Sequence, residues 1–457
     1  MLLAPEGTAR ASGFLSDQFG SDQGNPAMWN TYSVYFNPAA MAGMHGSEIT
    51  LDGVFAARSL DYTRSPLALG QCPNPPYQGG AYYSESNTGK ATLFNVLSAP
   101  YIGFVTDFGG SRWRLGIASY IPFGGEVSWG KNQAYAGSAI VPGGYDGPQR
   151  WSSISANTSS LYETAALAYR FEKARLGIGL SASVIRTGIT DTRARNGNGT
   201  DDIVSPNGTI EEGRTYLDAS GFQVGAAAGL QWEATKDGRL RFGASYTSQP
   251  NFGTMRLNGT FKYSAGLTAE STNNIDLLQA YPDVVRLGMA WRVTPQTELR
   301  LDGDWERWSQ FQYQCVVHKG ASCGADSHGV STDTTNVLLD LPRDWKDTMK
   351  VRLGIAYWAS PQAEIHASAF WNSPPVGLSH QDPLIFDSTR IGGTLGVRYG
   401  FNKHFYGALS YTYVYLVPVT VNNSAAPNNP LPSTSPSTNG YYTSELYIFD
   451  AALSYRF

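Results

Sequence analysis

The feature that most constrains this chain is a long alternation of apolar and polar residues, which begins near Gly46. From Val285 to Val293 every second side chain is apolar, and Arg286 and Arg292 fall between them. Side chains of a β-strand point alternately to its two faces, so each run predicts a strand with one apolar and one polar surface. Many runs reach about ten residues and carry aromatic residues near their ends, whereas a soluble strand has about five or six residues. The pattern favours a membrane-spanning β-barrel with a lipid-facing band bordered by aromatic side chains.

The composition agrees with such a barrel and argues against other classes. Only 15% of the 457 residues are charged, 50 are glycine, and the mean hydropathy is −0.27. No stretch approaches the roughly 18 consecutive apolar residues that a transmembrane helix requires. The net charge of −4 and the lack of a basic stripe give no reason to expect a nucleic-acid partner. A large soluble β-sandwich or propeller fits the composition too, so strand length and aromatic ends decide for the barrel.

Short turns fix the expected number of strands. Six tight turns separate paired runs, and most of them contain the Gly, Pro, Asn or Asp that turns favour. The turns are at 109–112, 172–175, 236–239, 294–296, 360–362 and 402–404. Six hairpins with one strand before and one after give about fourteen strands, an even number as in bacterial outer-membrane barrels.

The last run, Leu446 to Phe457, is the clearest single strand. It alternates aromatic and aliphatic residues with Asp450, Ser454 and Arg456, and Phe457 lies on the apolar face. A barrel must pair its last strand completely, because a free edge is not tolerated in lipid. A terminal Phe in this position looks like the recognition signal of the outer-membrane insertion machinery, which we therefore expect as a partner.

The segment before the barrel has a different character. Residues 12–46 do not alternate and are small, polar and glycine-rich. Fourteen strands enclose a space that strand side chains alone do not fill. We therefore expect residues 12–46 to form a hatch inside the lumen and residues 47–457 to form the barrel. Residues 1–11 are interpreted as the remainder of a leader, because Ala9-Arg10-Ala11 has the small-x-small form of a cleavage site.

Four motifs in order resemble the FadL family of outer-membrane transporters, which includes the TodX branch. They are Ser12-Gly13-Phe14, the segment 36–42 with Asn37-Pro38-Ala39, the segment 305–311 (WERWSQF) and the segment 341–348 (LPRDWKDT). The resemblance extends from about Ser12 to Phe457. It implies a fourteen-stranded barrel plugged by an N-terminal hatch, import of hydrophobic compounds, and a kink in the third strand that opens the wall sideways. Phe14, Asn37, Pro38 and Ala39 are the hatch residues that it selects.

Charged residues on the polar faces of the strands form a second group. They are Glu298, Arg300, Asp302, Asp304, Glu306, Lys350, Arg352 and Arg398. Clustered carboxylates can serve as catalytic acid and base. Here the neighbouring cations favour a neutralised network in the lumen that helps to anchor the hatch.

A transporter of hydrophobic ligands also needs a gap in the wall through which the ligand reaches the bilayer. Pro122, Phe123, Gly124 and Gly125 are the candidate residues in the third strand, because Pro lacks a backbone donor and consecutive Gly favour a bulge. The alternative is that Pro122 merely ends the strand at the outer rim.

Ligand contacts are expected in two places. Tyr135, Ile140 and Val141 are candidates for an external groove in the loop 129–160, although loop residues also pack on one another. Leu15 and Phe14 of the hatch are candidates for an internal pocket. Arg186 is the candidate partner for a ligand carboxylate, with ordinary pairing in the lumen network as the alternative.

Nothing in the sequence predicts a catalytic residue, a metal site or a cofactor. The six histidines are scattered without the arrangement of a catalytic triad. Cys315 and Cys323 lie close enough in sequence for a disulfide, but two free thiols remain the alternative. We expect a monomeric protein of a Gram-negative outer membrane, in contact with lipid and lipopolysaccharide. It would pass long-chain fatty acids or hydrocarbons passively, with ligand binding shifting the hatch. The rival functions are lipid export through the same fold and hydrolysis at the outer membrane.

Overall fold

The computed structural model describes residues 19–66, 85–204, 209–264, 266 and 270–457. The strands are β1 (Ser47–Arg64), β2 (Gly89–Thr106), β3 (Trp113–Ser128), β4 (Ser155–Phe171), β5 (Leu176–Arg195), β6 (Gly213–Glu233), β7 (Leu240–Thr247), β8 (Met255–Ser264), β9 (Ser271–Gln279), β10 (Val284–Arg292), β11 (Thr297–Glu306), β12 (Tyr313–His318), β13 (Val337–Pro342), β14 (Thr348–Trp358), β15 (Ala363–Asn372), β16 (Arg390–Gly400), β17 (Phe405–Val421) and β18 (Gly440–Arg456). Short helical turns are η1 (Ser21–Gln23), α1 (Ser33–Phe36), η2 (Pro38–Gly43), η4 (Gln133–Tyr135), η5 (Pro142–Asp146), η6 (Pro148–Trp151), η7 (Pro250–Phe252), η8 (Trp308–Gln310), η9 (Leu378–His380) and η10 (Ala426–Asn428). Among the described residues, no helix is long and apolar enough to cross a membrane.

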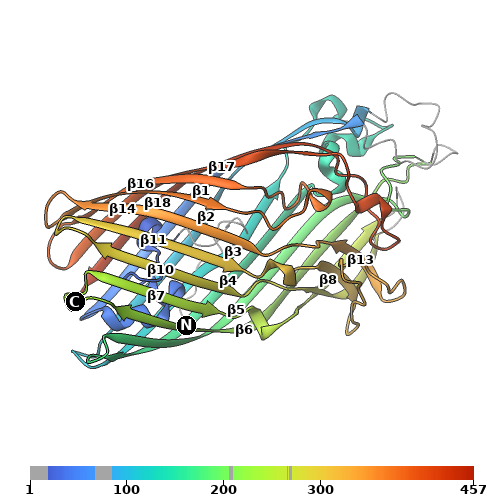
Figure 1. Ribbon diagram of the computed structural model, residues 1–457. Coiled ribbons are helices and arrows are strands. Elements are labelled where there is room, and N and C mark those ends of the chain that lie inside the picture. Colours follow the sequence, from blue (N-terminus) through green and yellow to red (C-terminus); the bar gives the residue numbers. More distant parts are fainter. Residues whose placement is uncertain (1–18, 67–84, 205–208, 265, 267–269) are drawn as a thin grey trace.

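The strands form one closed antiparallel barrel, because β1 pairs with both β2 and β18. Four wall strands are each broken into two segments, namely β7 with β8, β9 with β10, β11 with β12, and β13 with β14. The eighteen segments of the described chain therefore make fourteen wall strands, which confirms the predicted number. All six predicted turns connect neighbouring strands. Figure 1 shows them at one end of the barrel and the long loops at the other.

The predicted alternation is confirmed in the wall. Along β14, Lys350 and Arg352 are buried while Val351, Leu353 and Ile355 are exposed. Along β18, Asp450 is buried, and the aromatic side chains of the opposite phase are exposed up to Phe457. Apolar side chains thus face the lipid and charged side chains face the lumen, as in an outer-membrane barrel.

The described part of the predicted hatch, residues 19–46, lies within the ring of strands (Figure 1). Almost every residue from Phe19 to Met44 is buried. Asn37 ties this segment to itself and to the wall. Its side-chain amide donates to the backbone oxygens of Pro26 (2.8 Å) and of Leu230 in β6 (2.9 Å). Its side-chain oxygen accepts from the amide of Ala39 at 3.1 Å, so the Asn-Pro-Ala motif forms the start of η2.

Glycines in the wall make room for the hatch. A Cβ atom at Gly116 would lie 2.5 Å from the sulfur of Met41, and one at Gly177 would lie 2.7 Å from the backbone oxygen of Ala39. The glycines that approach the hatch in this way are Gly116 (β3), Gly177 and Gly179 (β5), Gly229 (β6), Gly243 (β7), Gly288 (β10) and Gly354 (β14). The hatch backbone therefore packs directly on the strand backbones around much of the barrel.

Candidate functional site

Four consecutive wall strands are interrupted, and three of the breaks bring aromatic side chains into the lumen. The breaks are 248–254, 280–283, 307–312 and 343–347, and residues at their ends pair with one another, as Val284 does with both Thr247 and Glu306. Pro250 and Pro282 lie in two of the breaks, and Pro342 borders another. Since proline cannot donate to the ladder, these positions favour interruption of the strand.

The breaks at 280–283, 307–312 and 343–347 line a cavity inside the barrel. Its aromatic members are Phe123, Tyr281, Trp308, Phe311 and Trp345, and Leu384 and Ile385 from the loop after β15 add to its apolar lining. The ring centres of Trp308 and Trp345 are 4.9 Å apart, and those of Phe123 and Tyr281 are 4.8 Å apart. Arg58, Glu126, Thr158 and Gln314 supply polar groups. The cavity therefore suits an apolar ligand with at most a small polar head.

A series of ring contacts connects this cavity with the hatch. Phe123 contacts Tyr162 (6.3 Å between ring centres), Tyr162 contacts Tyr120 (5.6 Å), and Tyr120 contacts Tyr35 of the hatch (4.9 Å). Tyr35 in turn contacts Phe19 at 5.5 Å. A movement of the hatch would therefore displace the side chains that line the cavity.

The predicted break in the third strand is present as an irregularity of β3. The pairing of β3 with β4 changes register between Tyr120 and Phe123, so Ile121 and Pro122 form a bulge. The strand continues to Ser128, so the alternative that Pro122 ends it at the rim is wrong. Phe123 and Gly125 line the cavity, and Gly124 pairs with Ser159 of β4.

On its other side, β3 separates from β2 at the same level. The ladder between the two strands stops at the pair Tyr101 and Tyr120, although β2 runs on to Gly89 and stays paired with β1. Pro100 is the residue next to Tyr101 in the part of β2 that is unpaired with β3, and Pro122 lies in β3. Each strand therefore lacks one backbone donor where the two strands separate. The backbone ladder between β2 and β3 is therefore interrupted next to the aromatic cavity, and we call this interruption the gap.

Two side chains bridge the end of this gap that lies away from the pair Tyr101 and Tyr120. Arg58 of β1 and Asn95 of β2 both donate to the backbone oxygen of Glu126 in β3, each at 2.7 Å. Beyond them the backbone amide of Gly130 donates to the oxygen of Thr92 at 2.9 Å. The gap thus spans about six residues of each strand, from Pro100 to Asn95 on one side and from Ile121 to Glu126 on the other.

The structure separates the three residues predicted for an external groove. Tyr135 and Val141 are buried and pack with Trp151, Ala194 and Ile203 in a core formed by the loops, as in the alternative interpretation. Ile140 is exposed and does not belong to this cluster. Phe14, Leu15 and the predicted leader 1–11 lie outside the described residues.

The prediction for Arg186 is wrong. Its neighbours Ile185 and Thr187 are fully buried, so alternation turns Arg186 outward, where it is exposed beside Val184 and opposite Phe222 of β6. Arg58, which the sequence analysis did not select, is the arginine that lines the cavity.

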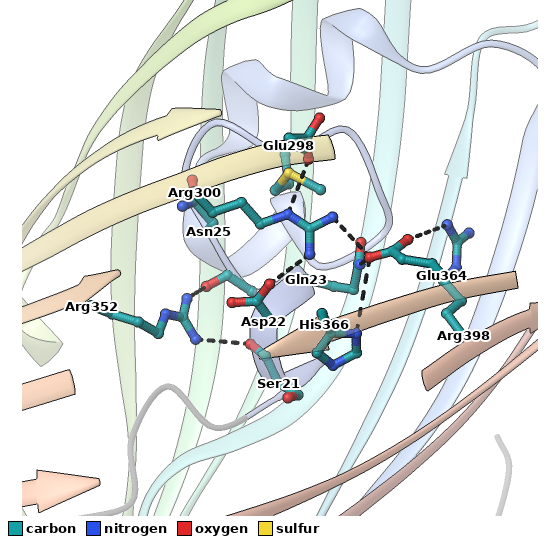
Figure 2. Close-up of polar contacts among 12 residues, drawn as sticks. Ser21, Asp22, Gln23, Asn25, Glu298, Arg300, Arg352, Glu364, His366 and Arg398 are labelled. Atoms are coloured by element: carbon teal, nitrogen blue, oxygen red, sulfur yellow. Dashed lines mark hydrogen bonds and ion pairs between the residues drawn. The ribbon is translucent and has the colours of Figure 1, made fainter. Parts of the chain in front are cut away.

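The predicted charge network holds the hatch in place (Figure 2). Arg300 contacts Asp22 of the hatch at 2.6 Å, Glu298 at 3.0 Å and Glu364 at 2.9 Å, and all four side chains are almost fully buried. Arg352 bonds Asp302 at 2.9 Å and donates to the backbone oxygens of Ser21 (2.9 Å) and Gly24. Every carboxylate drawn in Figure 2 has a cation beside it, so the network is neutralised and structural, as predicted.

A second buried network ties the long loops together at the opposite end. Arg150 makes a two-fold contact with Glu212 (2.9 Å for each pair of atoms), and Arg214 bonds both Glu212 and Asp146 at 2.7 Å. Burial opposes ionisation of Glu212, but the charges and hydrogen bonds of Arg150 and Arg214 outweigh it and lower the pKa of Glu212 below its ordinary value. The ionised network therefore stabilises the closed loops.

The remaining candidates for chemistry are few in the described part of the chain. Cys315 and Cys323 form a disulfide beside the sheet made by β8, β9, β12 and β13, which settles the pairing that the sequence left open. Ser379 contacts the Nδ1 atom of His380 at 3.1 Å near the loops. Within the described ranges no carboxylate forms an ion pair with His380, so this contact lacks the acid that would orient a catalytic histidine.

A closed barrel with apolar outer and charged inner faces and an internal N-terminal segment defines an outer-membrane β-barrel of the plugged type. The family model for outer membrane protein transport proteins (OMPP1/FadL/TodX) matches residues 23–457. The chain belongs to this family, and it is an outer-membrane protein.

Known relatives share the fold at low sequence identity. A long-chain fatty acid transport protein of Escherichia coli is 21% identical over 386 residues, covering 77% of this chain and 80% of that protein. The crystal structure of a Pseudomonas aeruginosa FadL homologue superposes with a TM-score of 0.74 at 15% identity, over 98% of both chains. That of the Pseudomonas putida toluene transporter TodX gives 0.63 at 14% identity, over 98% of this chain and 99% of that one.

Proposed function

We propose that this protein imports hydrophobic small molecules, long-chain fatty acids or hydrocarbons, through the aromatic cavity and the gap between β2 and β3 into the outer leaflet of the membrane. The observation that carries the proposal is that the cavity and the gap share Phe123, Gly125 and Glu126 of β3. A ligand held by the aromatic side chains therefore lies next to an interruption of the wall.

The physical obstacle for such a ligand is the polar lipopolysaccharide layer outside the bilayer. Within the cavity the ligand contacts rings such as Trp308 and Trp345 in place of water, and burial of apolar surface gives roughly 25 cal/mol per Å². Sideways passage then leads from one apolar environment to another, so the ligand need not cross the charged network around Arg300. Passive diffusion is sufficient, and neither a nucleotide nor a catalytic step is required.

The hatch would act as the closure below the cavity. Ring contacts run from Tyr35 of the hatch through Tyr120 to Phe123 of the cavity. Through these contacts, ligand binding can shift the hatch, and a shift of the hatch can change ligand binding. The terminal Phe457 remains the predicted signal for barrel insertion, and a monomer remains the predicted state.

The test is uptake of radiolabelled oleate and of toluene by cells that lack their own transporter. Replacing Gly124 and Gly125 by Leu fills the gap, and we expect uptake to fall to the level of cells without the protein. Gly188→Leu in β5 is the matched control, because a Cβ at Gly188 meets no atom within 4 Å. Unchanged uptake by the folded double variant would contradict lateral passage. Release of preloaded oleate without any uptake would instead favour an exporter.

A further inference from the structure

Arg58 occupies two roles in the structure at once. Its side chain lines the aromatic cavity, and its Nη2 atom donates to the backbone oxygen of Glu126 across the gap. The Nε–H of Arg58 is buried and has no hydrogen-bond partner among the described residues. This guanidinium therefore has an unused donor beside an apolar cavity, and an anion is the acceptor that a guanidinium binds most strongly.

The charged residues that line the cavity balance each other. Glu126 is also a lining residue, and the charge of its carboxylate attracts Arg58, so the two charges compensate each other. An acidic ligand that enters this space adds a second negative charge. It competes with Glu126 for Arg58 and repels the Glu126 carboxylate at the same time.

Glu126 belongs to the segment of β3 that closes the gap. Its backbone oxygen accepts hydrogen bonds from both Arg58 and Asn95, and these two side-chain bonds span the gap. Displacement of Glu126 from Arg58 therefore removes half of this clamp. The backbone of β3 is already bulged at Ile121 and Pro122, so the segment beyond the bulge has a place about which to bend.

We propose that Arg58 couples recognition to release: the carboxylate of an acidic amphiphile binds Arg58, displaces the Glu126 segment and thereby widens the gap through which the ligand leaves. This inference rests on the proposed function, and it makes acidic amphiphiles the preferred substrates over uncharged ones of equal length. An uncharged ligand binds the aromatic rings but leaves the clamp closed. Selectivity then arises at the wall as well as in the cavity.

The experiment compares oleate with oleyl alcohol, which have the same chain and differ in the head group. We expect the wild-type protein to take up oleate in preference to the alcohol. Arg58→Met removes the anion site and half of the clamp, so we expect the oleate-to-alcohol uptake ratio to fall by about tenfold to a hundredfold. Asn95→Ala weakens the clamp alone, and we expect it to raise uptake of the alcohol while oleate uptake changes little.

Glu126→Gln separates binding from release. It removes the repulsion, so oleate should bind the purified protein more tightly in a tryptophan-fluorescence titration while oleate uptake falls. A merely structural role of Arg58 and Glu126 would change binding and uptake in the same direction.

The outcomes distinguish the two proposals. A folded Arg58→Met protein, verified by its heat-dependent mobility in gels, that retains the wild-type preference for oleate overturns the coupling. So does a Glu126→Gln protein in which binding and uptake rise together. If the wild-type protein raises uptake of neither compound, or if filling the gap at Gly124 and Gly125 has no effect, the proposed function itself fails.

Discussion

Replacement of Arg300 by Met should release the hatch while the barrel stays closed. Arg300 is the buried cation that joins Asp22 of the hatch to Glu298 and Glu364 of the wall. Methionine has nearly the same length and shape but carries no charge, so the change removes the ion pairs and leaves little empty space. The ladder that closes the wall between β1 and β18 is untouched.

The magnitude follows from the partners that remain. Loss of one member of a buried ion pair costs about 3–5 kcal/mol. Glu298 keeps Arg241 at 2.8 Å, and Glu364 keeps Arg398 at 3.9 Å, whereas Arg300 is the one cation within ion-pair distance of Asp22 among the described residues. Because two of the three carboxylates keep a cation, the loss of Arg300 should cost the lower end of this range, about 3 kcal/mol. This free energy corresponds to a shift of roughly 150-fold in the docking equilibrium of the hatch.

Hydrogen exchange measures this shift directly. Amides of residues 19–44 should lose about 150-fold of their protection, whereas amides of the β1–β18 ladder should keep theirs. Arg239→Met is the matched control, because its ion pair with Asp237 is exposed and is worth about 0–1 kcal/mol. Equal protection of the hatch in the Arg300 variant and the wild type, or an equal loss in the Arg239 control, would refute the reasoning.

Two further predictions concern the packing of the hatch and the loops. Gly177→Val places side-chain atoms against the backbone oxygen of Ala39 and should weaken hatch docking by about 1–3 kcal/mol, measured by the same exchange experiment; an unchanged hatch would show that the strand backbone yields instead. Because the pKa of Glu212 is lowered in the folded state, its ionised form stabilises the loops above its ordinary pKa of 4.5, and this stabilisation is lost as the pH falls through the lowered value. Limited proteolysis of intact cells should therefore leave the loops intact at pH 7 and cut them increasingly as the pH is lowered below 4.5. Arg150→Met should make them sensitive at pH 7 as well, and a pH-independent cutting pattern would count against the network.

Much of the fold follows from local patterns in the chain. Turns such as 402–404 and the alternation along β14 and β18 depend only on neighbouring residues, so the strand number and the inward faces were predictable. The charge network was predictable for the same reason, since Arg300 and Asp302 share a phase with Glu298 in a single strand.

The cavity was not predictable in this way. Tyr281, Trp308 and Trp345 come from breaks in different strands, and between runs of alternation they have the local signature of ordinary loops. The motifs around Trp308 and Trp345 resemble those of the FadL family, but this resemblance does not predict that they form a pocket. Their meeting depends on the register of four neighbouring strands, which is a property of the closed barrel.

The error at Arg186 has a similar origin. In β5 both phases contain aliphatic residues, with Val184 on the outer face and Ile185 and Ile189 on the inner face. Hydrophobic pattern alone therefore does not choose the phase, and only pairing with β6 settles it. Arg58 was not predictable as a cavity residue, because the sequence of β1 does not indicate that the neighbouring ladder between β2 and β3 is interrupted.

The four strand breaks have a consequence for how such a channel diversifies. Residues 280–283 and 307–312 contribute rings to the cavity but belong to no strand segment of the wall. Substitution of these aromatic residues changes the shape of the cavity without breaking the strand pairing of the barrel. Different sets of positions therefore determine the substrate range and the stability of the barrel. Substitutions can change the substrate range while the barrel stays intact.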